Sequence, residues 1–267
     1  MISGYIKGLI LSLYPFRRGR KSLIRFLSFR FPGPILYSGT YGARYLLDGR
    51  NYIDQRILRD GVFEREGLDS LCHAITERRC DLFLDIGANI GVYALAVALR
   101  TGCRDITCFE PDPMNRNQFA ANIFLNGLDD RITVRTEAVS DREGSATFYL
   151  QRDKEHLSSG QSSLESFEDG IMPFAQGATH SVDVQVARLD TLLSVTGRSI
   201  AIKLDVEGHE ANAIRGMAEL IRRNRIYLQI EIWDANFDAM RRLLEELGLS
   251  CERRFMEHDY IFTKDNW

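Results

Sequence analysis

Acidic residues are absent from the beginning of this chain, where the first one is Asp48. The full sequence of 267 residues has a net charge of −3, so it gives no reason to expect nucleic-acid binding. The acid-free stretch is strongly basic, and this asymmetry predicts contact with an anionic surface, unless the cations only solvate a terminal helix. Its eight cationic residues are Lys7, Arg17, Arg18, Arg20, Lys21, Arg25, Arg30 and Arg44.

The chain also lacks any Cys-x-x-Cys pair, and its number of cysteines is odd. This pattern argues against a disulfide framework and against a zinc site. It favours a reducing compartment, so we expect a cytoplasmic protein. The five cysteines are Cys72, Cys80, Cys103, Cys108 and Cys251.

No apolar run is long enough to cross a bilayer, and the longest one near the start covers only residues 8–16. Arginines follow this run without a small-x-small cleavage site, which argues against a signal peptide. We divide the chain into a basic amphipathic extension, residues 1–35, and a catalytic domain, residues 36–267. The extension lies either on the inner face of a membrane or against the domain. Its apolar residues at helical spacing are Ile6, Leu9, Ile10 and Leu13.

Strand and helix signals alternate through the rest of the chain, which predicts a doubly wound, mostly parallel α/β sheet of seven strands. Apolar runs predict buried strands over residues 82–86, 106–109, 132–139, 200–204 and 226–232. Helical spacing predicts helices over residues 64–79, 92–99, 115–125, 211–223 and 237–247. We expect turns and short strands over 32–60, exposed strands over 144–151 and 181–188, and a closing antiparallel hairpin over 250–264.

The segment between the two exposed strands, residues 152–180, is rich in serine, glycine and charge. A loop of this length inside a compact domain is usually functional. We therefore expect its stretch Ser158-Ser-Gly-Gln-Ser-Ser163 to form part of a lid over the substrate. A disordered insertion is the alternative.

The first predicted strand ends in Asp85-Ile-Gly-Ala-Asn-Ile-Gly91 and opens directly into a helix. Ligands of such sheets bind beyond the carboxyl ends of the strands, where glycine lets the backbone approach them closely. Glu110 ends the next strand 23 residues after Gly87, the spacing of a carboxylate that receives the ribose hydroxyls of an adenosine cofactor. Alternatively, the glycines only shape a tight turn and Asp85 caps the helix.

Asn89 stands where a dinucleotide-binding fingerprint needs its middle glycine, which makes room for a pyrophosphate. A cofactor with adenosine but no pyrophosphate does not need that glycine. S-adenosylmethionine fits this description, and Asp85 could face its cationic end. A nicotinamide-dependent oxidoreductase of the Rossmann type is the competing enzyme class, and Asn89 argues against it.

These motifs make the chain resemble the FkbM family of S-adenosylmethionine-dependent methyltransferases over residues 40–264. The most specific stretch is Lys203-Leu-Asp-Val-Glu-Gly-His-Glu210 after the fourth parallel strand. The resemblance implies a class I, Rossmann-like methyltransferase fold. It also implies O-methylation of a hydroxyl on a sugar, a glycan or glycolipid, or a polyketide-like product. The matching stretches are residues 61–66, 84–91, 109–113, 138–141 with Gly144, and 203–210.

The same resemblance implies the residues that bind the cofactor, with residues 138–141 beside the adenine. Glu64 and Glu66 contact either the cofactor's ammonium or the acceptor, or they only begin a solvated helix. The motifs and the resemblance together predict a cofactor-binding set of Asp85, Gly87, Asn89, Gly91, Glu110, Ala138, Val139, Asp141 and Glu64.

A neutral acceptor hydroxyl needs a base to take its proton, and the candidates follow the fourth and fifth parallel strands. We predict that Asp205 or Glu207 is this base. Lys203 would neutralise part of the carboxylate cluster as an ion-pair partner. Glu231 and His209 are further candidates, although His209 is better explained as a residue at a helix start.

Clustered carboxylates also raise the possibility of a divalent metal such as Mg²⁺, but nothing in the sequence fixes a ligand geometry, so we do not favour one. A non-catalytic module that keeps the fold and binds only a partner is a further alternative. The presence of both expected cofactor carboxylates, Asp85 and Glu110, argues against it. The acceptor's identity and the oligomeric state stay open.

Overall fold

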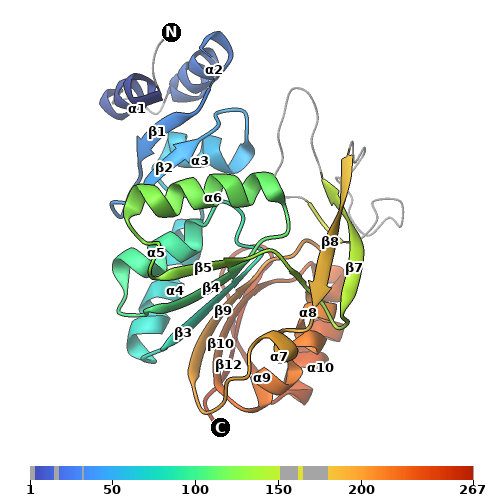
Figure 1. Ribbon diagram of the computed structural model, residues 1–267. Coiled ribbons are helices and arrows are strands. Elements are labelled where there is room, and N and C mark those ends of the chain that lie inside the picture. Colours follow the sequence, from blue (N-terminus) through green and yellow to red (C-terminus); the bar gives the residue numbers. More distant parts are fainter. Residues whose placement is uncertain (1–3, 15–17, 32, 151–161, 165–179, 267) are drawn as a thin grey trace.

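A seven-stranded sheet forms the centre of the molecule in Figure 1, a computed structural model that describes residues 4–14, 18–31, 33–150, 162–164 and 180–266. The strand order is β11-β12-β10-β9-β3-β4-β5, and only the β11–β12 and β12–β10 pairs are antiparallel. The predicted doubly wound, mostly parallel sheet with a C-terminal antiparallel hairpin is confirmed. Its strands are β3 (Leu82–Ile86), β4 (Asp105–Phe109), β5 (Ile132–Arg135), β9 (Ser199–Leu204), β10 (Arg225–Glu231), β11 (Ser250–Arg254) and β12 (Asp259–Lys264).

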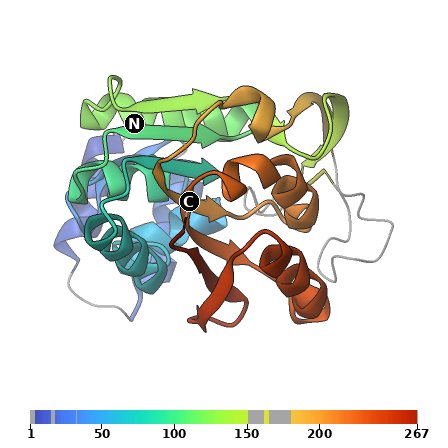
Figure 2. The same ribbon diagram turned by 90° about the horizontal axis from the view of Figure 1, so that it is seen from below.

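Helices cover both faces of this sheet (Figures 1 and 2) because its central strands are apolar on both sides. Alternate residues of one strand enter different cores: Ala201 packs in one, while Ile200 and Ile202 pack in the other. Helices α4 (Arg65–Glu77), α5 (Val92–Arg100) and α6 (Pro113–Asn126) cover the first core. The second core lies under α7 (Leu189–Leu192), α8 (Glu210–Gly216), α9 (Ala218–Arg222) and α10 (Phe237–Glu246), which follows a 3-10 turn, η3 (Asp234–Asn236).

The prediction of one strand over residues 132–139 was wrong. The chain leaves the main sheet after β5 and enters a separate three-stranded sheet, in the order β6-β8-β7. Glu137 marks the crossing, because its carboxylate pairs with Arg135 at 2.6 Å and accepts the Thr136 N–H. An apolar run cannot show that its two ends join different sheets. The strands are β6 (Ala138–Val139), β7 (Gly144–Leu150) and β8 (His180–Ala187).

The single helix predicted over residues 211–223 was also wrong, because the structure has α8 and α9 with a break at Met217. Gly216 explains the close packing at this break: a Cβ there would overlap the carbonyl oxygen of Ser140. A helix was missed at α3 (Tyr52–Asp60). Its capping residues are visible in the sequence, since Asn51 accepts the Ile53 N–H and Gly61 ends the helix with a φ of 79°.

The N-terminal helices α1 (Gly4–Leu13) and α2 (Arg20–Arg30) pack at one end of the molecule, beside the two-stranded sheet of β1 (Ile35–Ser38) and β2 (Arg44–Leu47) (Figure 1). The boundary placed after residue 35 stays a prediction. No helix among the described residues is long and apolar enough to span a membrane. Most of the predicted lid, residues 152–180, lies outside the described residues.

We expect Gly91→Ala to lower the free energy of unfolding by roughly 2–4 kcal/mol. Gly91 has a φ of 85°, and a Cβ there would overlap the ring of the buried Phe119. Urea denaturation measures the effect. Gly42→Ala is the matched control, because Gly42 also has a positive φ, 77°, and nothing lies within 4 Å of the Cβ it would add. Equal stability of the two variants would contradict the packing described here.

Candidate active site

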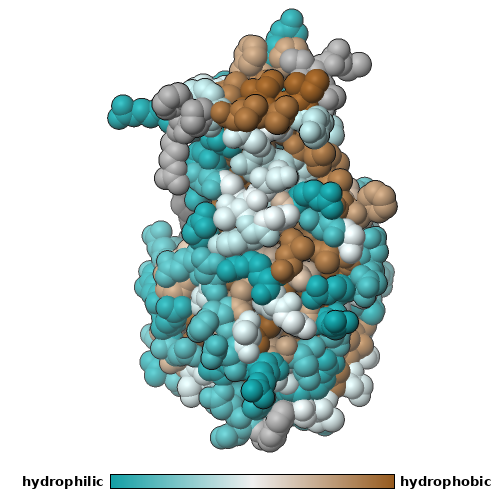
Figure 3. Space-filling model, turned by 90° about the vertical axis from the view of Figure 1, so that its left-hand side faces the viewer, coloured by the Kyte–Doolittle hydropathy of each residue, from teal (hydrophilic) through white to brown (hydrophobic). Residues whose placement is uncertain are grey.

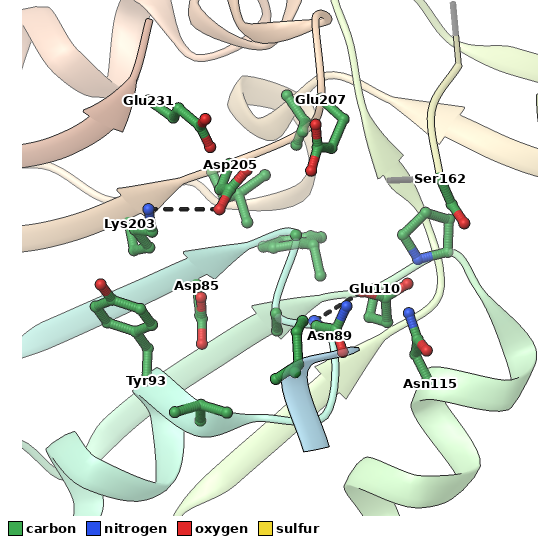
Figure 4. Close-up of a pocket in the computed structure, with 18 of the residues that line it drawn as sticks. Asp85, Asn89, Tyr93, Glu110, Asn115, Ser162, Lys203, Asp205, Glu207 and Glu231 are labelled. Carbon is green, nitrogen blue, oxygen red and sulfur yellow. Dashed lines mark hydrogen bonds and ion pairs between the residues drawn. The ribbon is translucent and has the colours of Figure 1, made fainter. Parts of the chain in front are cut away.

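A cavity of about 550 Å³ opens beyond the carboxyl ends of β3, β4, β9 and β10. This is the edge at which doubly wound sheets bind their ligands. Figure 4 shows that side chains from the ends of these strands converge on it. Most of the site residues predicted from the sequence line this cavity: Glu64, Asp85, Gly87, Asn89, Glu110, Ala138, Val139, Lys203, Asp205, Glu207, His209 and Glu231.

The turn after β3 passes directly beneath the loop after β9. A Cβ at Gly87 would overlap the carbonyl oxygen of Asp205, so only glycine fits the contact between the two loops. Gly87 has a φ of 86° and Asn89 a φ of 51°, both in the left-handed region. The glycine turn therefore exposes backbone to the cavity and also brings the two halves of the site together.

Glu110 is buried at the end of β4 with both carboxylate oxygens held by backbone donors. The Asn89 N–H donates to Oε2 at 2.8 Å, and the Asp112 N–H donates to Oε1 at 2.8 Å. Burial raises the pKa of Glu110 to about 7, against the effect of these hydrogen bonds. The Glu110 carboxylate also forms a hydrogen bond with the Asn115 side chain, so it is fixed on the cavity wall and can still accept a ligand hydroxyl.

Asp85 caps a helix, as one of the two sequence interpretations proposed, and it also lines the cavity. Its Oδ2 accepts the Ala94 N–H at 3.2 Å, in the first turn of α5. Burial raises the pKa of Asp85 to about 7, although the ammonium of Lys203 opposes this shift.

Lys203 is the central cation of the site and is 3% exposed. Register places it beside Asp85 on β3 and Gln229 on β10. Its Nζ lies 3.5 Å from a carboxylate oxygen of Asp205 and 3.5 Å from one of Asp259. Burial opposes its charge, but the carboxylates, Asp205 first, raise the pKa of Lys203 well above its ordinary value. The prediction that Lys203 takes part in an ion-pair network is confirmed.

Glu64 reaches the same region from the start of α4, where its φ is 46°. The Tyr93 hydroxyl donates to Glu64 Oε2 at 2.9 Å and lies 3.1 Å from Gln229 Nε2. Burial raises the pKa of Glu64 above its ordinary value. Glu66, its companion in the prediction, is exposed to solvent and does not line the cavity.

Two further carboxylates, Glu207 and Glu231, face the cavity near Asp205 (Figure 4). Burial, followed by the charges of Asp205 and Glu231, raises the pKa of Glu207 well above its ordinary value. The charge of Asp205, followed by burial, raises the pKa of Glu231 to about 9. Proton-accepting groups with raised affinity for a proton therefore lie at one end of the cavity.

The loop around Glu207 is held firmly by its neighbours. Ser163 Oγ donates to the Glu207 carbonyl at 2.6 Å, and Glu210 accepts the N–H groups of Val206 and Gly208. Glu207 itself has a φ of 51°, a strained conformation for a side chain of its size. His209 shares a hydrogen bond with Ser140 at 3.0 Å and another with Asn212, so both of its ring nitrogens have neighbours within the protein.

Two predicted cofactor residues do not line the cavity. Gly91 lies under the turn against Phe119, and Asp141 lies beside Ser140 behind β6. Other lining residues were missed by the sequence analysis, among them Tyr93 and Asn115, whereas Ser162 belongs to the stretch predicted to form part of a lid. Tyr93 had a signal, since it is the one polar side chain in the apolar helix α5 before Arg100. Asn115 had none.

The chain also matches a known protein family. Residues 85–251 match the methyltransferase FkbM domain. The chain belongs to the FkbM methyltransferases. It is therefore an S-adenosylmethionine-dependent methyltransferase, as its sequence motifs led us to expect.

Two curated relatives share about a quarter of their residues with this methyltransferase. The hexuronic acid methyltransferase AglP of Haloferax volcanii is 26% identical over 68% of this chain and 69% of its own length. The 2-O-methyltransferase NoeI of Sinorhizobium fredii is 27% identical over 65% of this chain and 74% of its own length. A crystal structure of a methyltransferase FkbM from Methylobacillus flagellatus is 17% identical, with a TM-score of 0.47 over 69% of this chain and 43% of that one.

The cavity suits a cationic cofactor better than an anionic one. Its permanently charged cations are Arg50 and Lys203, and the carboxylates of its wall outnumber them. An acidic, partly desolvated wall stabilises a sulfonium and an ammonium but repels a pyrophosphate. The competing nicotinamide cofactor therefore fits poorly. The carboxylates of the wall are Glu64, Asp85, Glu110, Glu137, Asp205, Glu207 and Glu231.

Among the described residues, no group of His, Cys, Asp and Glu has the arrangement of a metal site.

We expect Glu110→Ala to weaken S-adenosylmethionine binding by roughly 1.5–3 kcal/mol, the cost of losing hydrogen bonds to a charged acceptor. Titration calorimetry measures this affinity. Glu66→Ala is the control, because that carboxylate is exposed and outside the cavity. Unchanged affinity in Glu110→Ala would exclude a direct contact with the cofactor.

The ligand-free protein should lose stability as the pH rises from about 5 to about 9. The pKa of Glu231 rises from 4.5 to about 9 on folding, so the folded state keeps a proton that the unfolded chain has already lost. Glu231→Gln should reduce this loss by at least about 1 kcal/mol, as measured by urea unfolding across that pH range. Glu246→Gln, on the exposed side of α10, should follow the wild-type profile. Parallel profiles for all three proteins would refute the raised pKa.

Proposed function

We propose that this methyltransferase transfers a methyl group from S-adenosylmethionine to a hydroxyl oxygen of a sugar or glycan acceptor. The observation that carries the proposal is the pair of carboxylates, Glu207 and Glu231, that face the cavity and have raised proton affinity. The names of two relatives, a hexuronic acid methyltransferase and a 2-O-methyltransferase, support the same acceptor class. A polyketide-like hydroxyl has no comparable support.

Glu110 and the Gly87 turn would hold the nucleoside part of the cofactor. The Glu110 oxygens are fixed by two backbone N–H groups, so they would accept ribose hydroxyls without a change of conformation. Ala138 and Val139 offer the apolar surface next to them for the adenine. Asp85 and Glu64 would favour the cationic amino-acid end by their charge. When bound, S-adenosylmethionine supplies a methyl group that its sulfonium has already activated for transfer.

The task of the protein is then to orient the acceptor oxygen, exclude water and accept a proton. Glu207 suits the last role best. No hydrogen bond or ion pair of its carboxylate occurs among the described residues, while the carboxylate of Asp205 is paired with Lys203. The left-handed backbone at Glu207 directs this side chain into the cavity, and Ser163 and Glu210 hold the loop in place.

Burial and, after it, negative charge in the cavity raise the pKa of Glu207. Without a ligand, Asp205 and Glu231 make a second and third negative charge costly, so the cluster retains protons. A cation bound nearby favours the ionised carboxylates and releases those protons. Once the cationic cofactor is bound, Glu207 would be ionised and able to accept the proton of the acceptor hydroxyl.

The acceptor would enter over the aromatic rim of the cavity. Tyr52, Phe63 and Trp233 line this part, and the Trp233 ring stacks on His258 with centroids 4.5 Å apart. Aromatic surface together with a few polar groups is typical of small-ligand sites. Gln55 and Arg50, which also pairs with Asp48, add hydrogen-bond donors to the lining of the cavity.

The proposal predicts that Glu207→Gln lowers kcat by roughly 10²–10⁴-fold while S-adenosylmethionine affinity stays within about threefold. The amide keeps the size of the side chain but cannot take the proton. Turnover on a panel of glycans and uronic acids, detected as S-adenosylhomocysteine, measures the rate. Asp205→Asn is the comparison, since Asp205 was the equal candidate in the sequence.

A larger loss in Asp205→Asn than in Glu207→Gln would transfer the role of base to Asp205. Near-normal turnover in both variants would refute a base in this loop. A chelator that abolishes activity, with restoration by Mg²⁺, would indicate metal-assisted chemistry instead.

A further inference from the structure

The helix α1 is apolar on the side that faces away from the protein. Its inward side consists of Gly4, Lys7, Gly8 and Leu11, which are buried or half-buried. The opposite side carries large apolar residues, and Leu13 is 72% exposed. A surface helix normally shows the reverse pattern, with its apolar side toward the core. The exposed apolar side of α1 therefore needs another surface to cover it.

The helix α2 extends the same pattern. Ile24 and Leu27 are buried on its inner side, while Phe26 and Phe29 are 57% and 58% exposed. The two helices are in contact, and Figure 3 shows apolar surface gathered at this end of the molecule. We call this surface the apolar N-terminal face, formed by Tyr5, Leu9, Ile10, Leu13, Phe26 and Phe29.

The helices are attached firmly to the body, so the apolar N-terminal face is presented in a fixed orientation. The ammonium of Lys7 is buried and donates to the carbonyls of Phe31, at 3.0 Å, and Gly33, at 2.6 Å. A Cβ at Gly8 would overlap the Leu36 carbonyl oxygen, so α1 lies directly on β1. Arg20 donates to the Leu58 carbonyl at 2.8 Å and ties α2 to α3.

The charged residues near the apolar N-terminal face indicate the kind of partner that it binds. The exposed cations Arg18, Lys21, Arg25 and Arg30 lie on or next to α2, and no acidic residue occurs before Asp48. The Arg25 guanidinium lies 5.9 Å from the centre of the Phe29 ring, so a cation directly adjoins the exposed aromatic surface. Large apolar side chains with several exposed cations beside them match the interface of an anionic lipid bilayer.

We propose that the apolar N-terminal face inserts into the surface of an anionic membrane and holds the enzyme there as a peripheral protein. The apolar residues enter the boundary between headgroups and acyl chains, while the arginines and Lys21 meet lipid phosphates. A protein partner of the same pattern would need acidic groups around an apolar groove, and a second copy of this face would bring like charges together. A lipid surface satisfies both features without such repulsion.

The apolar half of this proposal is tested by flotation of the full chain with vesicles of phosphatidylcholine mixed with phosphatidylglycerol. Leu13→Ser combined with Phe29→Ser should lower the fraction bound by at least about tenfold. The matched control is Leu99→Ser, which removes an exposed leucine from α5. S-adenosylmethionine affinity should stay unchanged in every variant, which separates this result from any failure of the active-site assignment.

The electrostatic half is tested with Lys21→Gln combined with Arg25→Gln. We expect about tenfold weaker binding to the mixed vesicles, and salt should weaken wild-type binding in the same way. Arg242→Gln, an exposed arginine on α10, is the control and should bind like the wild type. Wild-type protein that ignores mixed vesicles at low salt would overturn the proposal. So would a wild-type dimer that Leu13→Ser with Phe29→Ser dissociates, since the face would then be covered by a second copy.

Discussion

The buried ammonium of Lys203 is the interaction on which the site depends. It lies on the central strand β9, within reach of Asp205 and Asp259 and 5.3 Å from the centre of the Tyr93 ring. These neighbours belong to different parts of the chain: the loop after β9, the last strand and the helix after β3. Without this cation, the carboxylates of Asp205 and Asp259 would be partly buried near one another with no compensating charge, which is costly.

One cation does not balance the carboxylates around it, and that imbalance gives the cavity its chemistry. Asp85 and Glu110 have a pKa of about 7, because burial disfavours their charged forms. Glu231 has a pKa of about 9, because of the charge of Asp205 and of burial. A cationic ligand relieves both effects at once. The same residues thus explain the preference for a sulfonium cofactor and supply groups able to accept a proton.

Three residues that line the cavity also have a strained backbone. Glu64, Asn89 and Glu207 have positive φ values between 46° and 51°, and all three line the cavity. Such conformations persist only where the surrounding structure enforces them.

At the other end of the molecule, α3 connects two regions: Arg20 of α2 donates to its Leu58 carbonyl, and its residues Tyr52 and Ile53 line the cavity. The helix α3 therefore contacts both the basic N-terminal helices and the cavity.

The sequence by itself determined the class of the sheet, the glycine turn after β3 and the family. These features are local, since a strand that ends in Asp85-Ile-Gly-Ala-Asn-Ile-Gly91 and a carboxylate one strand later carry their meaning in their spacing. The N-terminal cations and helical apolar spacing were equally visible. The sequence could not show which side of α1 faces the protein, because that depends on the glycines that let the helix lie against β1.

Only the tertiary structure decided which polar residues meet. Asp259 joins Lys203 because β12 pairs with β10 in a register that sets Asp259 beside Glu231. Ser162 and Asn115 reach the cavity from segments far apart in the chain. The crossing between β5 and β6 and the break at Met217 were likewise hidden. Periodicity reports how buried each residue is within its own element, whereas charge pairing and loop contact depend on distances between elements that no local pattern encodes.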